Sequence, residues 1–168
     1  MVDCKNISVV FQGIDRESFR KPFLGKSIRS IHFPETHSLI NAWGVRIMFD
    51  DSTCISLAGL STRVGDRVEF GSLKIISLND ETDFLADDIS WSKINVTNFQ
   101  VSNIDLIVYR SEEIYCEAGI SFLSSADKQI MFLASDAPCA ITIKLPDASV
   151  DCMDGEFEFE SYNIVKLE

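Results

Sequence analysis

Hydrophobic and polar residues alternate along most of the chain, which is the pattern of β-strands with one buried face. Val45, Ile47 and Phe49 fall on one side of such a strand. A turn at Asp50-Asp51-Ser52 then leads into residues 54–57, so we predict a β-hairpin there. The same alternation predicts further strands over residues 68–76, with a bend or bulge near Gly71, and over 104–108, 114–123, 130–134, 141–145 and 157–167.

Helical periodicity is poor, and only residues 16–23 and 37–42 fit a turn or two of helix. We therefore predict an all-β fold, mainly antiparallel, built as a sandwich or a barrel with at most one or two short helices. The last predicted strand has the cleanest alternation. Its apolar residues point one way, and Glu156, Glu158 and Glu160 point the other.

Two parts of the chain are similar to each other. The matching blocks are residues 28–33 and 43–49 with 104–109 and 118–122, and residues 68–78 with 157–167. The three blocks of the first half occur in the same order as their counterparts in the second half. We therefore predict a pseudo-repeat of residues 1–78 and 94–168, joined by a connector over 79–93. Strand sequences draw on a small set of residue types, so chance similarity is the open alternative.

Length and composition indicate one folded domain over residues 1–168, since the hydrophobic fraction is 46% and the charged fraction 24%. No run approaches the roughly 20 apolar residues of a membrane span. The amino terminus lacks the basic and apolar regions of a secretory signal. The five cysteines are scattered and show no CxxC spacing, which is typical of reduced thiols. We expect a cytoplasmic protein.

The net charge of −11 is distributed unevenly along the chain. Residues 1–49 carry seven Lys or Arg and four Asp or Glu, a net of +3, so residues 50–168 carry a net of −14. Such an excess repels nucleic acid and anionic membranes, and it attracts a basic partner from a distance. We therefore expect a basic protein as the partner, with no nucleic acid and no membrane.

The acids gather in the predicted connector and before the carboxyl terminus. An aromatic anchor rimmed by acids is typical of a docking surface, and like charges on one strand face favour a cationic partner. The predicted partner-binding residues are Asp80, Glu81, Asp83, Phe84, Asp87, Asp88, Glu156, Glu158 and Glu160. The alternative is a solvated face that keeps the protein soluble, with Phe84 packed on the core.

Candidate catalytic chemistry is sparse. His32 and His37 do not have the spacing of two metal ligands on one helix face. Cys116 stands beside Glu117, but it lies in an apolar strand, where a buried inert thiol is the expected outcome. Paired acids such as Asp50-Asp51 fall in turn-like stretches. We predict no catalytic residue, no metal ligand and no cofactor.

Residues 117–122 and 129–143 share one pattern. A strand begins near a glycine and is followed by a second strand and a Pro-containing turn. This pattern resembles small β-rich bacterial immunity proteins of contact-dependent inhibition and other polymorphic toxin systems. The resemblance covers only this part of the chain. It implies a cytoplasmic, non-enzymatic protein that binds one toxin domain and blocks its active site or substrate groove.

The leading hypothesis is therefore an immunity protein that neutralises a basic cognate toxin. We expect that toxin to be a nuclease, because acids can replace nucleic-acid phosphates on its basic face. One alternative is a small-molecule binder or hydrolase with an Asp/Glu site in a β-barrel cleft, using His37. Another is a structural assembly component whose acids only keep it soluble.

Overall fold

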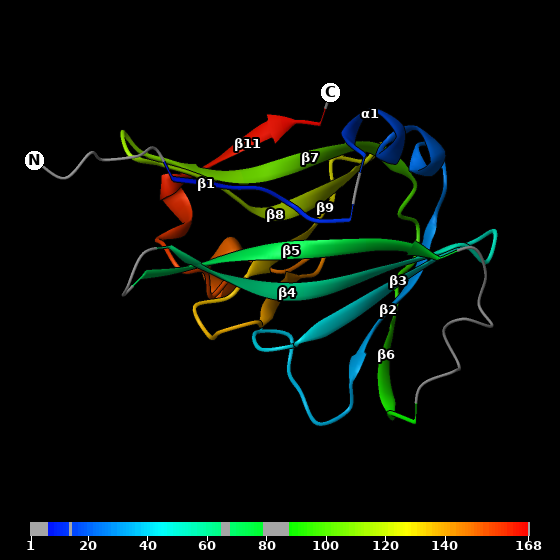
Figure 1. Cartoon of the computed structure of the whole chain (residues 1–168). Coiled ribbons are helices and arrows are strands. Elements are labelled where there is room, and N and C mark those ends of the chain that lie inside the picture. Colours follow the sequence, from blue (N-terminus) through cyan, green and yellow to red (C-terminus); the bar gives the residue numbers. More distant parts are fainter. Residues whose placement is uncertain (1–6, 14, 65–67, 79–87, 168) are drawn as a thin grey trace, which may run out of the picture.

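Two β-sheets packed face to face form the molecule (Figure 1). The structure is a computed structural model, and it describes residues 7–13, 15–64, 68–78 and 88–167. The strands of the first sheet, in the order β5-β4-β3-β2-β6, are β2 (Ile28–Pro34), β3 (Gly44–Phe49), β4 (Cys54–Val64), β5 (Val68–Leu78) and β6 (Trp91–Asn95). The sheets do not close into a barrel, so the all-β, sandwich-like prediction is confirmed.

The second sheet has the order β10-β9-β8-β7-β11, and β1 pairs in parallel with β8 outside this path. Its strands are β1 (Ile7–Val9), β7 (Val101–Arg110), β8 (Ile114–Ser124), β9 (Gln129–Ala134), β10 (Ile141–Lys144) and β11 (Tyr162–Lys166). The helical elements are α1 (Arg16–Phe19) and the 3-10 turns η1 (Lys21–Phe23), η2 (Val150–Cys152) and η3 (Phe159–Ser161). Within the described residues, no helix is long and apolar enough to cross a membrane.

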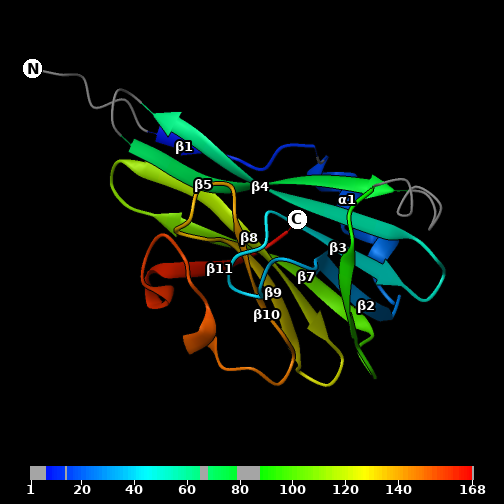
Figure 2. The ribbon, with the colours of Figure 1, turned by 90° about the horizontal axis from the view of Figure 1, so that it is seen from below.

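Both sheets have the same topology. In each, four consecutive strands form an antiparallel meander, and the fifth returns to pair with the first (Figure 2). The matched blocks 28–33 and 104–109 lie in the equivalent strands β2 and β7. The blocks 68–78 and 157–167 do not, since β5 is a fourth strand and β11 a fifth. The internal duplication itself stays a prediction. β6 completes the first sheet, so the last residues of the predicted connector, 91–93, lie in a strand.

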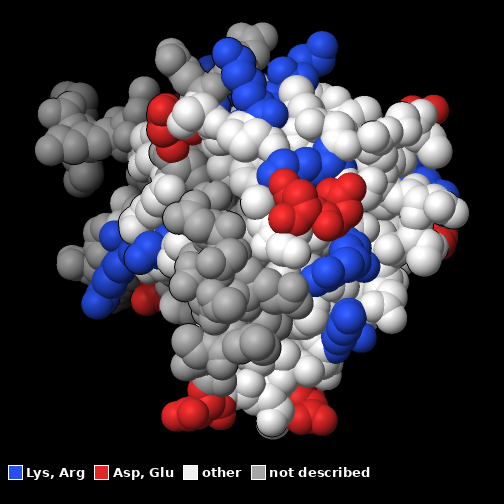
Figure 3. Space-filling model, turned by 90° about the vertical axis from the view of Figure 1, so that its right-hand side faces the viewer, with Lys and Arg blue, Asp and Glu red and all other residues white. Residues whose placement is uncertain are grey.

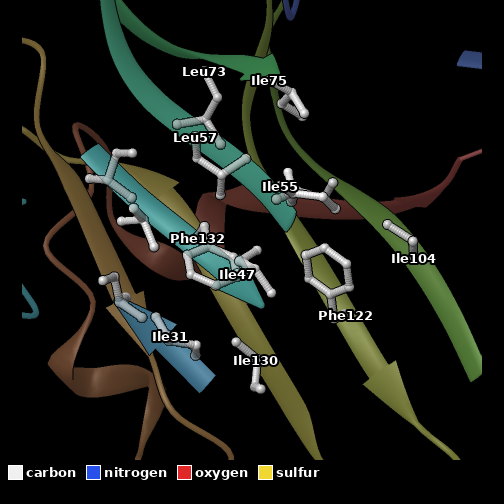
Figure 4. Packing of buried hydrophobic residues seen from close by; sticks show 14 of the residues in the cluster. Ile31, Ile47, Ile55, Leu57, Leu73, Ile75, Ile104, Phe122, Ile130 and Phe132 are labelled. Carbon is white, nitrogen blue, oxygen red and sulfur yellow. The ribbon is translucent and has the colours of Figure 1, made fainter. Parts of the chain in front are cut away.

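The predicted hairpin is formed by β3 and β4, with Val45 opposite Leu57 and Ile47 opposite Ile55. These side chains are buried between the sheets together with Phe122 and Phe132, whose rings meet edge to face at 6.0 Å (Figure 4). Four more buried isoleucines and one leucine are labelled in the same view, namely Ile31, Leu73, Ile75, Ile104 and Ile130. This filled apolar interior is the main stabilising feature of the sandwich.

Two local predictions need correction. The predicted bulge near Gly71 is absent, because β5 pairs with β4 along its whole length in a continuous register. Gly71 is required instead by close packing, because a Cβ there would lie 2.8 Å from the Ala134 Cβ. Residues 37–42 are not helical, because residues Leu39 and Ala42 use their backbone to bond β10 at Ile143 and Ile141. The prediction over 16–23 is confirmed by α1 and η1.

An ion pair fastens the start of β2 to the turn between β3 and β4. Lys26 Nζ lies 2.5 Å from Asp51 Oδ2, and the Thr53 hydroxyl and amide both donate to Asp51 Oδ1. The hydrogen bond from Lys26, followed by that from Thr53, lowers the pKa of Asp51 from 3.8 to about 2. The carboxylate therefore contributes stability above its unfolded-state pKa, and this contribution is lost as the pH falls through the folded-state pKa.

Asp51→Asn is accordingly expected to reduce stability at pH 7 and to have little effect near pH 2. The loss is at most about 1 kcal/mol, because the Asp51 side chain is 44% exposed and solvent screens the pair. Urea unfolding of the wild type and the variant at pH 7, 4, 3 and 2 measures this gap. A gap that stayed constant from pH 7 to pH 2 would contradict the assignment.

Candidate protein-binding site

The connection from β10 to β11, residues 145–161, lies against the outer face of the second sheet (orange to red in Figure 2). We call this segment the acidic crossover. Its residues Met153, Phe157 and Phe159 pack on a second apolar cluster that includes Ile107 and Leu133. These two side chains lie on the opposite face of the sheet from the main core, because neighbouring strand residues alternate between faces.

Aromatic contacts fix the crossover in place. The Phe157 ring stacks on Tyr109 with 3.6 Å between centroids and 4° between planes. The Phe157 amide donates to the Tyr162 hydroxyl at 3.2 Å. Burial raises the pKa of Tyr162 to about 12, so this hydroxyl is neutral at physiological pH. The crossover is thus a rigid support for its polar side chains.

The predicted final strand was wrong in its first half. Residues 156–161 are not in a strand, and β11 begins at Tyr162. The alternation arises because Phe157 and Phe159 both pack on the same cluster while the intervening residues do not. Glu156, Glu158 and Glu160 therefore do not form a ladder on one strand face.

Five exposed carboxylates follow one another along the crossover, and its sequence contains no Lys or Arg. They are Asp147, Asp151, Asp154, Glu158 and Glu160. Asp147 forms an ion pair with Lys128 at 3.4 Å, from outside the segment. By contrast, the face of the molecule in Figure 3 carries acidic and basic side chains side by side. The crossover therefore carries a net negative charge, which favours a cationic ligand.

Glu156 differs from these acids because it is half-buried. Its Oε2 accepts the Gly71 amide at 2.9 Å, which ties the crossover to β5. Burial raises the pKa of Glu156, and the neighbouring Asp136 adds to this effect. Both carboxylates line a cleft of about 40 Å³ together with Glu69 and Cys139. A cleft of that volume holds a water molecule, so we assign Glu156 a structural role.

The predicted residues of the connector are only partly visible. Asp80, Glu81, Asp83, Phe84 and Asp87 lie outside the described residues, and their role stays a prediction. Asp88 is exposed shortly before β6.

The residue pair Cys116 and Glu117 is buried and does not have the properties of a nucleophile with its base. Burial raises the pKa of Cys116 to about 12, and its thiol donates to the Gly71 carbonyl. Glu117 is fully buried, forms an ion pair with Arg16, and accepts the Phe11 amide at 2.8 Å and the Tyr115 hydroxyl at 3.0 Å. The contacts of Glu117 with Phe11 and Arg16 connect the amino-terminal segment to β8, and the Cys116 thiol connects β8 to β5.

The histidines have local partners. His32 Nε2 lies 2.9 Å from the Ser30 hydroxyl, and His37 Nδ1 accepts the Trp43 amide. Within the described residues, no group of three His, Cys, Asp or Glu side chains is placed to hold a metal ion.

A larger groove of about 380 Å³ lies where β6 ends beside the start of the crossover. Its walls include Ile94, Val96 and Leu145, which sequence reasoning did not single out. Among the described residues that line it, the one carboxylate is Asp147. The groove therefore lacks the two converging acids that a glycosidase-like site requires.

Comparison of the chain with protein-family models, curated proteins and solved structures found no match.

Proposed function

We propose that the protein is a non-enzymatic immunity protein that binds and neutralises a basic toxin domain, a nuclease, through the acidic crossover. The observation that carries the proposal is the row of five exposed carboxylates on a segment held in place by partly buried aromatic side chains. The resemblance of residues 117–122 and 129–143 to immunity proteins suggests the class of partner. The acidic connector, with Phe84 as an anchor, is the second candidate surface.

The physical basis is electrostatic. A nuclease binds phosphates with Lys and Arg side chains, and closely spaced carboxylates offer the same charge to that face. Complementary charge accelerates association and selects against acidic partners. The crossover is already ordered by Phe157 and Tyr109, so binding requires little further loss of conformational entropy in this segment.

The binding test needs the candidate toxin, for which we take the carboxy-terminal domain of the protein encoded by the gene next to this one. That domain is used in a catalytically inactive form. The variant Asp151→Asn/Asp154→Asn/Glu158→Gln removes three charges from the crossover. We expect the association rate to fall about tenfold or more at low salt, and the difference to shrink as salt rises. Surface plasmon resonance at several salt concentrations measures both effects.

The matched control, Glu35→Gln/Asp50→Asn/Asp127→Asn, removes three exposed charges outside the crossover. Asn is tolerated at the positive φ of Asp127. Equal loss in both triple variants would mean that only net charge matters. No binding by the wild type would contradict the proposed function. A third variant, Asp80→Asn/Glu81→Gln/Asp83→Asn, tests the connector, and loss confined to it would transfer the site there.

A further inference from the structure

The outer face of the first sheet, which points away from the second sheet, is basic. Arg46 of β3 is opposite His32 of β2, and His32 is opposite Lys93 of β6. These three residues share the outer face, because their strand neighbours Ile31 and Ile47 are buried in the main core. The five strands of this sheet contain five Lys or Arg and one Asp or Glu, in a chain whose net charge is −11. The outer face therefore favours an anionic occupant.

The connection from β5 to β6, residues 79–90, begins and ends at opposite corners of this face. β5 and β6 are the two edge strands (Figure 1), and they hold Leu78 and Trp91, the residues before and after the connection. The strand registers place Leu78 level with Asn95, which lies four residues beyond Trp91 on β6. The connection therefore has to cross about 19 Å of sheet width and about 13 Å of strand length, and its twelve residues can reach about 40 Å. Because the inner face packs against the second sheet, the direct route lies across the outer face.

Burial of the outer face follows the diagonal between these two corners. Met48 and Cys54 point outward from β3 and β4, yet they are 1% and 0% exposed. Among the described residues, these two form an apolar cluster of their own, separate from the main core. Farther along the diagonal, Arg46 is 7% exposed, and its guanidinium carbon lies 4.2 Å from the centre of the Trp91 ring. Lys74 on β5, away from the diagonal, is exposed.

Residues 79–87, which lie outside the described ranges, have the composition that this diagonal requires. They include four Asp or Glu and no Lys or Arg, together with Phe84 and Leu85. A buried cation such as Arg46 is stable only beside an anion or hydrogen-bond acceptors. β2, β3, β4 and β6 contain no Asp or Glu, so the connection is the nearest acidic segment that joins two strands of this sheet. Its apolar side chains suit the apolar cluster on the same diagonal.

We propose that residues 79–87 dock along this diagonal, with their carboxylates beside Arg46 and its basic neighbours and their apolar side chains on Met48 and Cys54. The acids of the connection then compensate the cations of the sheet, which leaves the acidic crossover as the surface for a toxin. The inference does not rest on the proposed function, because the docking occurs within one chain and requires no toxin.

Alkylation of Cys54 by iodoacetamide, measured by peptide mass spectrometry on the full chain alone, reports whether the diagonal is covered. Arg46→Gln removes the cation at the centre of the diagonal. We expect it to raise the alkylation rate of Cys54 about tenfold, because it weakens the docked state by one charged hydrogen-bonded contact. The variant Asp80→Asn/Glu81→Gln/Asp83→Asn removes three charges from the docked segment and is expected to raise the rate at least as much.

Lys74→Gln is the matched control, because it removes a cation from the same face away from the diagonal, and it is expected to leave the rate unchanged. Cys116 is the internal reference for global unfolding, since it is buried within the second sheet. Faster alkylation of Cys54 without a change at Cys116 supports the proposal. A Cys54 rate that stays at the wild-type value in either variant, or that rises only in step with the rate of Cys116, overturns it.

Discussion

Glu117→Ala is expected to lower the free energy of unfolding by about 3 kcal/mol, because it leaves buried donors without an acceptor. The Phe11 amide and the Tyr115 hydroxyl both donate to this carboxylate, and Arg16 pairs with it. The Arg16 side chain is 44% exposed and can be solvated by water in the variant, which limits the free-energy cost of losing the ion pair. Phe11 lies between β1, which pairs with β8, and Gln12, which bonds to β5. Loss of the hydrogen bond from the Phe11 amide is therefore expected to loosen the contacts of this segment with both sheets.

Urea unfolding measures the global effect, and hydrogen exchange of the amides of residues 7–12 measures the local one. Glu117→Gln keeps the shape and one acceptor, so we expect it to lose about half as much. Glu113→Gln removes an exposed acid near the start of the same strand and serves as the matched control. If Glu117→Ala unfolded within about 0.5 kcal/mol of that control, the carboxylate would not be an organising contact.

This buried network shows where sequence reasoning stops. A single acid within the apolar run of β8 is a signal of a paired buried carboxylate. The signal does not name the partner, because Arg16 lies 101 residues away and is brought there by the path of β1. Sequence alone therefore relates Glu117 only to Cys116, its neighbour in the chain.

The strands were more predictable than their surroundings. The β3–β4 hairpin follows from local alternation and from an Asp-Ser turn in which Ser52 has a φ of 66°. The crossover has the same alternation over 156–161, yet it forms no strand, because packing on one side alone suffices to produce the pattern. Whether an alternating segment becomes a strand depends on whether a neighbouring strand pairs with it, and such partners can be distant in the sequence.

The candidate surface was located by charge but not by shape. Charge alone predicts Glu156, Glu158 and Glu160 as binding residues, and the structure shows Glu158 and Glu160 exposed. Glu156 was grouped with them, since nothing in its neighbours reveals that it bonds the Gly71 amide, 85 residues away. Asp147 joins the patch only once the crossover is seen as one segment.

Gly59→Ala is the second substitution with a large expected effect, about 3 kcal/mol of destabilisation. Gly59 lies in β4 against the loop between β9 and β10. A Cβ at this position would lie 2.4 Å from the Cys139 carbonyl oxygen and 2.9 Å from the Ala140 nitrogen. Both atoms are backbone, and the loop is held by the bond from the Ser135 amide to the Ala140 carbonyl. The clash therefore cannot be relieved by a change of rotamer.

Gly44→Ala is the matched control, because Gly44 is also buried and lies opposite Ala58 in the neighbouring strand. Its added Cβ would meet one backbone atom, at 3.7 Å, which is an ordinary contact. We expect this variant to be as stable as the wild type or slightly more so, because alanine restricts the unfolded chain more than glycine. Thermal unfolding of both variants compares them directly. Equal midpoints would show that the two sheets are not in close contact at Gly59, and that the sandwich is more loosely joined there than this geometry requires.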